Sequence, residues 1–349
     1  MSFTVSVRSP AAEIAVDAGE AILDAALRQG VDYPHGCRSG NCGTCKSVLL
    51  AGEVEMSPYS EFALTEDEAA QGLILACRAV PWSDCVVVPV DAEDVQVHPQ
   101  RLLDCRVAAL DALTHDVRRL RLEIAGGGPF AFSAGQYASL EFPGLPRRDY
   151  SMANRPDEAI LEFHIRLMPG GAVTPFLRAG LKVGDAVRVF GPFGTSYWRA
   201  KHAGPILAFA GGSGLAPVKS IVETALAAGA RQPIRLWFGV RAERDVYFER
   251  ELEALAARHP NFSYEIVLSE PGGATARPTG FLAELLAREL GDVDGRKAYL
   301  AGPPVMVESC VAALVAKGLP RADCHADAFY TEAEKPRRAA GAARVGATP

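Results

Sequence analysis

Four cysteines have the spacing of an iron–sulfur ligand set. Cys37, Cys42 and Cys45 are separated by four and then two residues, and Cys77 follows Cys45 after 31 intervening residues. Plant-type [2Fe-2S] clusters are held by cysteine thiolates with this spacing. The chemistry that such a site supports is one-electron transfer. We therefore predict that these four cysteines bind a single [2Fe-2S] cluster.

The surrounding residues favour a cluster over other cysteine sites. Gly36, Gly40 and Gly43 punctuate the loop, and glycine lets a backbone wrap closely because it lacks Cβ and tolerates positive φ. The alternatives are a zinc site and a disulfide framework, but zinc ligands usually come as two short cysteine pairs. Cys85 also lies within reach of the fourth ligand position. We prefer Cys77, because Cys85 opens a strand-like run of valines.

The stretch Arg148-Asp149-Tyr150-Ser151 is compatible with flavin binding. An arginine can hold a phosphate through two hydrogen bonds, while the tyrosine can stack on a flavin and the serine hydroxyl can lie near its reactive nitrogen. The tetrapeptide alone fits an ordinary surface strand equally well. Further on, Gly170 and Gly171 precede Thr174, a predicted helix N-cap, and Pro175 at the first helical position. Free N–H groups at such a helix start suit a pyrophosphate.

Two more turns lie where α/β proteins bind dinucleotides. Residues 210–217 read Ala-Gly-Gly-Ser-Gly-Leu-Ala-Pro and lie between a buried strand and a helix. The string is neither the Gly-x-Gly-x-x-Gly fingerprint nor a P-loop, and a plain strand-to-helix turn is the structural alternative. Residues 302–306, Gly-Pro-Pro-Val-Met, again follow a strand and open a helix. Both turns are predicted at the carboxyl edge of a parallel sheet, where such folds bind ligands.

The elements predicted around these motifs indicate a multidomain α+β chain. Residues 1–95 alternate as a hairpin, a helix that ends at Gly30 and further strands, which predicts a β-grasp ferredoxin domain. Short strands with turn punctuation over 104–200 predict an antiparallel β-barrel, and the flavin-compatible motif lies in this range. Strands and helices alternate over 201–331, which predicts a parallel α/β domain, and the two dinucleotide-type turns lie in this range. We expect a linker at 96–103 and a flexible tail at 332–349.

Composition and charge exclude several classes of protein. The chain has 349 residues, which is too long for one ordinary core, and 49% of them are hydrophobic. The sequence shows no apolar leader and no apolar run long enough to cross a membrane. We therefore expect a cytoplasmic protein that binds no membrane, in which Cys85, Cys105, Cys310 and Cys324 stay reduced. Residues 1–95 carry a net charge of −10 and the remainder +4. This asymmetry fits a solvated acidic face or steering toward a basic protein partner, and nothing suggests nucleic-acid binding.

In the order and identity of these motifs, the chain resembles flavin-dependent reductases of the ferredoxin-NADP⁺-reductase type that carry an N-terminal plant-type ferredoxin domain. Reductase components of bacterial aromatic-ring dioxygenases and multicomponent monooxygenases have this arrangement. The resemblance covers about residues 1–331 and implies one [2Fe-2S] cluster, FAD and NADH or NADPH as cofactors. It implies an NAD(P)H:ferredoxin-type oxidoreductase that we expect to be monomeric, with a terminal oxygenase component, or its ferredoxin, as electron acceptor.

The resemblance also implies site residues. Ser151 near the flavin and Phe329 against the isoalloxazine ring would be the catalytic contacts. The remaining flavin residues would be Arg148, Tyr150, His164, Ile165, Arg166, Gly170, Gly171 and Thr174. The coenzyme residues would be Gly211, Gly212, Gly214, Pro217, Gly302, Pro303 and Met306, with Gly239 and Arg241 near the adenosine end. The chain departs from the family pattern at Thr174, where serine is common, and at Ala301, where many relatives have cysteine.

Several functions fit this resemblance. The leading hypothesis is a relay from NAD(P)H through FAD and the cluster to a Rieske-type aromatic-ring-hydroxylating dioxygenase. A reductase for a di-iron monooxygenase or a sugar-deoxygenating dehydratase is the alternative, and a non-catalytic redox sensor is a third. Arg241 and Arg244 could hold the 2′-phosphate of NADPH, but Glu243 and Asp245 between and beside them would repel it. We therefore expect NADH to be preferred.

Overall fold

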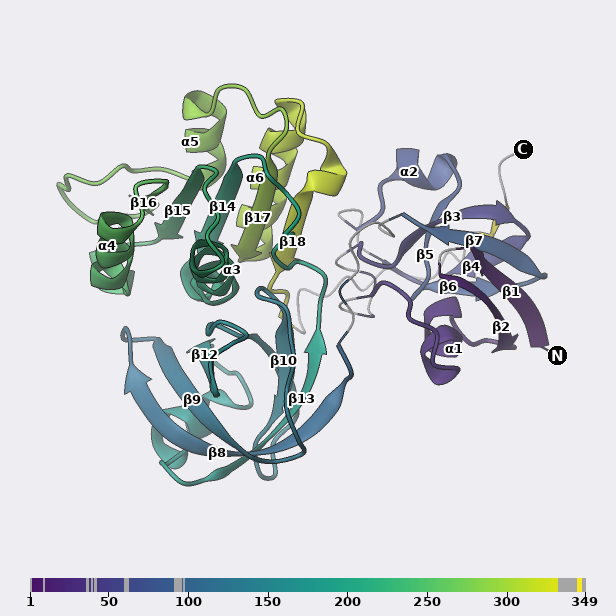
Figure 1. Ribbon diagram of the computed structural model, residues 1–349, viewed down its shortest axis with the longest axis horizontal. Helices are drawn as coiled ribbons and strands as arrows, with labels where there is room; N and C mark the ends of the chain where they lie inside the picture. Colours follow the sequence, from purple (N-terminus) through teal and green to yellow (C-terminus); the bar gives the residue numbers. More distant parts are fainter. Residues whose placement is uncertain are drawn as a thin grey trace. The chain divides into compact units, whose positions relative to one another are not determined.

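The structure is a computed structural model of the chain, and it describes residues 2–8, 10–35, 38, 40, 43–59, 63–90, 96, 98–331 and 344–346. The chain divides into two compact units, which can be followed in Figure 1. The first unit comprises Met1–Val97, Phe193–Thr195 and Tyr330–Pro349. The second comprises His98–Pro192 and Ser196–Phe329.

The first unit is a β-grasp fold, as predicted. Its five-stranded sheet has the order β2-β1-β7-β3-β5, in which β1 and β7 are parallel. Alternate residues of the first hairpin, such as Val5 and Ile14, are buried with Ile22 of the helix. The helix ends before Gly30, whose φ of +73° suits a glycine C-cap. The elements are β1 (Ser2–Arg8), β2 (Ala11–Asp17), α1 (Ile22–Arg28), β3 (Lys46–Ala51), β4 (Glu53–Met56), α2 (Glu66–Ala70), β5 (Leu73–Leu75), β6 (Ala79–Pro81) and β7 (Cys85–Pro89).

A short strand from the C-terminal segment joins this unit. The strand β19 (Arg344–Gly346) pairs antiparallel with β4, in a three-stranded sheet of order β19-β4-β6. These residues fall within the range 332–349 that we expected to be a flexible tail. An edge strand such as β4 presents backbone groups that any extended segment can pair with, so the pairing needs no apolar periodicity in the tail. The rest of that range lies outside the described residues.

The second unit begins with an antiparallel barrel. Its six strands have the order β11-β10-β13-β8-β9-β12, and a bridge between Met152 and Phe163 joins the two edges. The first strand starts at Arg101, inside the expected linker, because buried Leu103 already belongs to the barrel core. An extended linker and a strand share one backbone conformation, so the sequence does not separate them. The elements are β8 (Arg101–Ala112), β9 (Val117–Gly126), β10 (Tyr137–Glu141), β11 (Arg148–Ser151), β12 (Ile160–Arg166), η1 (Phe176–Gly180) and β13 (Ala186–Phe193).

A parallel α/β domain completes the second unit. Its strands have the order β16-β15-β14-β17-β18, and all four pairs are parallel. Every residue of the central strand β14 is buried, which explains its continuous apolar sequence. The elements are β14 (Ile206–Gly211), η2 (Gly212–Gly214), α3 (Leu215–Ala227), β15 (Ile234–Val240), η3 (Glu243–Asp245), α4 (Glu249–Arg258), β16 (Phe262–Leu268), α5 (Leu282–Glu289), β17 (Lys297–Gly302), α6 (Pro304–Ala316), η4 (Arg321–Asp323) and β18 (Cys324–Ala328).

The strand order reverses between β14 and β17, and sheets of this kind bind ligands outside the carboxyl ends of the strands at such a point. Right-handed crossovers place α3 and α4 on one face of the sheet and α5 and α6 on the other (Figure 1). Val117 and Ala134 of the barrel share one buried cluster with residues of β14 and α3. The barrel and the α/β domain therefore pack together as one body. Among the described residues, no helix is long and apolar enough to cross a membrane.

Candidate functional site

Two of the four predicted cluster ligands are described, and they lie together. The backbone N–H of Cys77 donates to Sγ of Cys45 at 3.4 Å, and both side chains are buried. Hydrogen bonds of this kind stabilise cluster thiolates and tune their potential. Cys37 and Cys42 lie outside the described residues. The pair that is described has the proximity that a shared cluster requires.

The glycines of this loop stand where a side chain would not fit. Gly40 and Gly43 have φ values of +78° and +75°. A Cβ on Gly43 would lie 2.9 Å from the carbonyl oxygen of Ala63, and one on Gly40 would lie 2.9 Å from Arg78 Cγ. The loop thus runs close to neighbouring backbone, which fits a closely wrapped cluster. Gly36 lies outside the described residues.

Cys85 occupies a different environment. Its thiol donates to the carbonyl oxygens of Ser83 at 3.3 Å and Glu53 at 3.6 Å, and burial raises its pKa. Burial also raises the pKa of Cys105 and Cys310 to about 12 and that of Cys324 to about 11. Thiols with such pKa values ionise poorly and are weak nucleophiles and ligands. All four are buried free cysteines.

The flavin motif forms the edge strand β11. Its residues pair with β10 so that Ser151 lies opposite Tyr137 and Arg148 lies opposite Leu140. The Arg148 guanidinium donates to the carbonyl of Arg147 at 2.7 Å and makes no ion pair within the described part of the chain, so its charge is not matched by a carboxylate there. Burial raises the pKa of Tyr150 to about 12, so its phenol stays protonated and can donate a hydrogen bond. The motif therefore offers a cation and two hydroxyls along one strand.

Ser151 connects this motif to the last strand of the parallel sheet. Its hydroxyl donates to Asp327 Oδ2 at 3.1 Å. Asp327 lies in β18, and the N–H of Phe329, two residues further on, donates to the carbonyl of Gly302 at 2.9 Å. Ser151, Phe329 and the turn at Gly302 are thus gathered at one place although they are far apart in sequence. Sequence analysis did not assign a role to Asp327.

The two coenzyme turns lie against each other at the carboxyl edge of β14 and β17. A Cβ on Gly211 would lie 2.6 Å from Met306 Sδ, and one on Gly214 would lie 2.0 Å from the carbonyl oxygen of Ala301. Gly302 has a φ of +142°, which only glycine adopts readily. Gly212 begins the 3₁₀ turn η2, and Pro217 is buried in the first turn of α3. This close approach of bare backbone is what a pyrophosphate cradle needs.

The turn after Gly170 and Gly171 differs from its prediction. Thr174 already belongs to the helical turn that continues as η1, and no side-chain hydrogen bond caps that element. A Cβ on Gly171 would lie 3.0 Å from Thr174 Oγ1, so the threonine hydroxyl lies over this glycine. Pro175 adopts helical angles as predicted. Thr174 is therefore a part of the turn and not its cap.

Residues 164–166 of β12 divide between the two sides of the barrel wall. Ile165 is fully buried in the barrel core, so only its backbone can meet a ligand. His164 is buried on the other side, where Nε2 lies 3.1 Å from Glu162 Oε1. Arg166 donates to Asp116 at 3.1 Å. Glu162, which the sequence analysis did not single out, follows from strand alternation because positions 162 and 164 share a face.

The two residues expected near the adenosine end lie on and just beyond β15. Gly239 is packed tightly, since a Cβ there would lie 3.0 Å from the side chain of Leu282. Arg241 forms ion pairs with Asp116 at 3.5 Å and with Asp245 at 3.8 Å. Its positive charge is therefore matched by two carboxylates.

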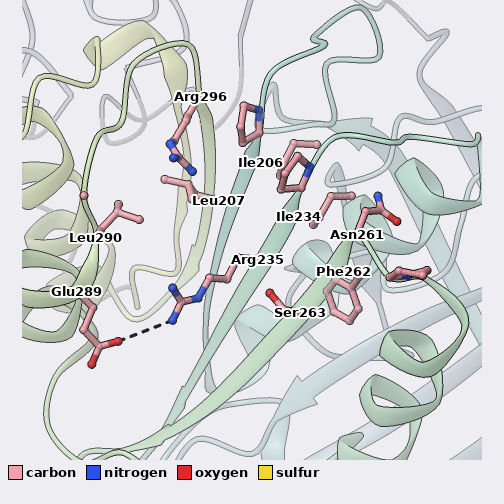
Figure 2. A pocket seen from close by; sticks show the side chains of 14 residues that line it. Ile206, Leu207, Ile234, Arg235, Asn261, Phe262, Ser263, Glu289, Leu290 and Arg296 are labelled. Carbon is pink, nitrogen blue, oxygen red and sulfur yellow. Dashed lines mark ion pairs between the residues drawn. The ribbon is translucent and has the colours of Figure 1, made fainter.

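A separate hollow lies at the opposite edge of the same sheet. Its volume is about 430 Å³, and Pro205, Pro233 and Pro260, which precede β14, β15 and β16, help to line it. Figure 2 shows the ion pair in its wall, in which Arg235 lies 3.7 Å from Glu289. Parallel sheets bind ligands at the carboxyl ends of their strands, whereas this hollow lies at the amino ends. We therefore do not assign it to the coenzyme.

Two buried histidines predict acid-sensitive stability. Burial lowers the pKa of His164, and burial with the neighbouring Arg199, Lys297 and Arg321 lowers that of His325 well below 6.5. The unfolded chain therefore takes up protons first as pH falls. Their contribution to the free energy of unfolding is complete well above pH 6.5 and is lost as the pH falls below it, by at most about 1.4 kcal/mol per histidine per pH unit. Denaturant unfolding between pH 8 and pH 5.5 measures this slope.

The control for that prediction is His325→Gln, which cannot titrate. Below pH 6.5, the free energy of unfolding of this variant should fall less steeply with decreasing pH than that of the wild type. The difference in slope corresponds to about one proton, close to 1.4 kcal/mol per pH unit. Unfolding free energies that stay constant from pH 8 to pH 5.5, or a slope unchanged in the variant, would contradict the assignment of His325 as a neutral buried residue.

Comparisons with known proteins agree with this geometry. The model of the 2Fe-2S iron-sulfur cluster binding domain matches residues 5–81, that of the oxidoreductase FAD-binding domain matches 104–198, and that of the oxidoreductase NAD-binding domain matches 209–312. The chain is 41% identical to the ferredoxin–NAD(P)⁺ reductase component of the naphthalene 1,2-dioxygenase/salicylate 5-hydroxylase systems of Ralstonia sp, over 90% of this chain and 94% of the relative.

Two further relatives cover nearly the whole chain. The reductase component of phenol 2-monooxygenase from Pseudomonas sp. (strain CF600) is 39% identical, and the match covers 96% of each chain. The crystal structure of an Amycolatopsis cytochrome P450 reductase is 37% identical and superimposes with a TM-score of 0.76, over 94% of this chain and 98% of that one.

Proposed function

The chain belongs to the family of ferredoxin–NAD(P)⁺ reductase components of oxygenase systems, and on this premise we propose that it carries electrons from NADH through FAD and a [2Fe-2S] cluster to a Rieske-type aromatic-ring-hydroxylating dioxygenase. It is an oxidoreductase with one domain for each of these three groups. The acceptor class and the coenzyme preference are the parts of the proposal that need experiments.

The residues present fit all three groups. FAD accepts a hydride from the nicotinamide and releases its electrons singly, and the cluster carries single electrons. Arg148, Tyr150 and Ser151 would hold the flavin, and the turn from Gly170 to Thr174 would lie against its pyrophosphate. The coenzyme would lie across the turns at 211–217 and 302–306. Cys37, Cys42, Cys45 and Cys77 would bind the iron.

The observation that carries the proposal is the convergence at Ser151. Ser151 donates to the carboxylate of Asp327, and the N–H of Phe329 donates to the Gly302 carbonyl, so the strand that would hold the flavin lies beside the turn that would hold the nicotinamide. Hydride transfer needs the reacting atoms within about 3–3.5 Å of each other, so two cofactor motifs must meet at one place. The Ser151 hydroxyl is oriented by the carboxylate, and the ring of Phe329, half-buried on the neighbouring core, can cover the flavin.

The surroundings of Arg241 support NADH over NADPH. Asp116 and Asp245 already balance its charge, and Glu243 is held by Arg277 at 3.0 Å. A 2′-phosphate placed here would meet carboxylates beside each cation, which disfavours its binding. NADH lacks that phosphate and meets no such repulsion.

The charge of the first domain supports a protein acceptor. Residues 1–95 carry a net charge of −10, which would steer a basic face of the oxygenase component toward the cluster domain. Because one relative is the reductase component of phenol 2-monooxygenase, a monooxygenase is the alternative acceptor. We also propose that the protein is a cytoplasmic monomer.

Visible spectroscopy tests the relay directly. We expect flavin bands together with broad cluster absorbance in the purified protein, and rapid anaerobic bleaching by NADH but not by NADPH at the same concentration. Equal bleaching by both coenzymes would contradict the NADH preference. A coloured protein inert to both would contradict the reductase function, and a colourless protein that contains zinc would contradict the cluster.

The acceptor class is tested by mixing the NADH-reduced protein with a purified Rieske dioxygenase and, separately, with the hydroxylase of a multicomponent monooxygenase. Faster reoxidation of the reductase by the dioxygenase supports the proposal. Preference for the monooxygenase would replace it with the alternative.

A further inference from the structure

One tyrosine hydroxyl touches both halves of the second unit. Tyr247 lies between η3 and α4 of the α/β domain. Its hydroxyl is 3.1 Å from the carbonyl oxygen of Gly212, in the glycine-rich turn, and 3.4 Å from Nδ1 of His164, in barrel strand β12. Tyr247 and His164 are both buried. The coenzyme turn and the flavin barrel are therefore connected through a single oxygen atom.

The proton positions around this oxygen follow from the neighbours. Burial acts to raise the pKa of Glu162, but the hydrogen bond from His164 and the charge of Lys219 prevail and lower it to about 2. The carboxylate can only accept, so Nε2 of His164 carries a hydrogen. Burial keeps the imidazole neutral, which leaves Nδ1 as an acceptor. The single Tyr247 hydroxyl hydrogen is thus shared between one acceptor on each domain, the Gly212 carbonyl at 3.1 Å and His164 Nδ1 at 3.4 Å.

The residue after Tyr247 supports the same junction. Phe248 has a φ of +60° and a ψ of +17°, a left-handed conformation that costs free energy in a bulky residue. Its ring stacks on the His164 ring with centroids 5.0 Å apart, and Lys219 and Arg119 place their cations within 5.8 Å of it. Strained backbone persists only where the surroundings over-determine it. Here the strained turn directs both aromatic side chains at His164.

A second set of contacts anchors the helix that follows the turn. Lys219 donates to the carbonyl of Ala153 at 3.1 Å, and the Ser220 hydroxyl donates to the carbonyl of Asn154 at 2.6 Å. The two acceptors lie two and three residues after Ser151. The body of α3 is therefore held by the barrel, and the turn in front of it is held by Tyr247.

From this arrangement we propose that the Tyr247 hydroxyl is a positioning group for hydride transfer, which holds the turn 211–217 at a set distance from the barrel wall that carries the flavin motif. The inference rests on the proposed reductase function. Loss of the hydroxyl frees the Gly212 carbonyl while the turn keeps its own backbone contacts. The coenzyme then still binds, but its reacting carbon is aligned less often, and rate falls more than affinity.

The test compares Tyr247→Phe with Tyr264→Phe. The second variant removes a hydroxyl from β16 of the same domain, away from both coenzyme turns. Stopped-flow reduction of the bound flavin gives the rate at saturating NADH and the dissociation constant separately. We expect the rate to fall about tenfold in Tyr247→Phe, with less than about a twofold change in the dissociation constant. Tyr264→Phe should match the wild type in both.

Hydrogen exchange of the protein without coenzyme provides a readout that does not depend on turnover. Amides of residues 212–215 should exchange faster in Tyr247→Phe than in Tyr264→Phe. Unchanged exchange and rate, or equal losses of affinity and rate with a lowered melting temperature, would overturn the positioning role. Failure of the wild type to be bleached by NADH would instead refute the proposed function, so the two failures are distinguishable.

Discussion

Replacing Cys77 with serine is expected to abolish electron delivery to the oxygenase component while NADH still bleaches the flavin. The cluster needs four thiolates, and Cys77 lies with its N–H 3.4 Å from Cys45 Sγ, where the ligands converge. The flavin and coenzyme motifs lie in the second unit and do not depend on that ligand. Loss of the broad cluster absorbance, measured together with retained ferricyanide reduction by NADH, checks the prediction.

Cys85→Ser is the matched control, because it makes the same chemical change in the same domain. The Cys85 thiol donates to two backbone carbonyls, and a serine hydroxyl can make the same hydrogen bonds. We expect full cluster content and full electron delivery in this variant. If Cys85→Ser lost the cluster and Cys77→Ser kept it, the assignment of the fourth ligand would be wrong.

Among glycine-to-alanine substitutions in the coenzyme domain, we expect Gly214→Ala to be the most damaging. The new Cβ would lie 2.0 Å from the carbonyl oxygen of Ala301 and 2.4 Å from its carbon, both of them backbone atoms of β17. Because neither can move without breaking the sheet, the turn must shift away. We expect a loss of about 2–4 kcal/mol in the free energy of unfolding and loss of flavin reduction by NADH.

Gly229→Ala separates that steric effect from backbone strain. Gly229 follows α3 with a φ of +81°, and a Cβ there would meet nothing within 4 Å. Its substitution should cost about 1–2 kcal/mol through strain alone and leave NADH reduction intact. Denaturant unfolding and NADH titration of both variants provide the comparison. Normal NADH reduction by Gly214→Ala would show that the close approach to β17 is dispensable.

Much of the fold could be predicted because its signals are local. The spacing of the cysteines, the alternation in the first hairpin and the apolar run 206–210 each reflect contacts within a few residues or the period of one element. The strand that opens at Arg101 was assigned to a linker, because extended backbone has the same pattern whether or not it is paired. The sequence around residues 344–346 has no apolar pattern that would indicate their pairing with β4.

The parts of the site that sequence analysis missed are long-range contacts. The Ser151–Asp327 hydrogen bond joins residues 176 positions apart, and Tyr247 reaches His164 across 83 positions. Such contacts depend on how the barrel packs on the α/β domain, which no local pattern records. The prediction that Thr174 is the helix N-cap was wrong, because Thr174 already lies inside the helical turn. A threonine before a proline indicates a cap whether or not its hydroxyl accepts a hydrogen bond from a backbone N–H.

The hydrogen bonds between α3 and the barrel determine how the domains of such reductases can be exchanged. Lys219 and Ser220 bond to backbone carbonyls at Ala153 and Asn154, so the acceptors exist whatever side chains occupy those positions. The Tyr247 contact instead needs a histidine at 164 and a carboxylate at 162. A chimera that grafts a foreign coenzyme domain onto this barrel would therefore need donor side chains at the positions of Lys219 and Ser220 to dock, and a tyrosine that matches this histidine to transfer hydride well.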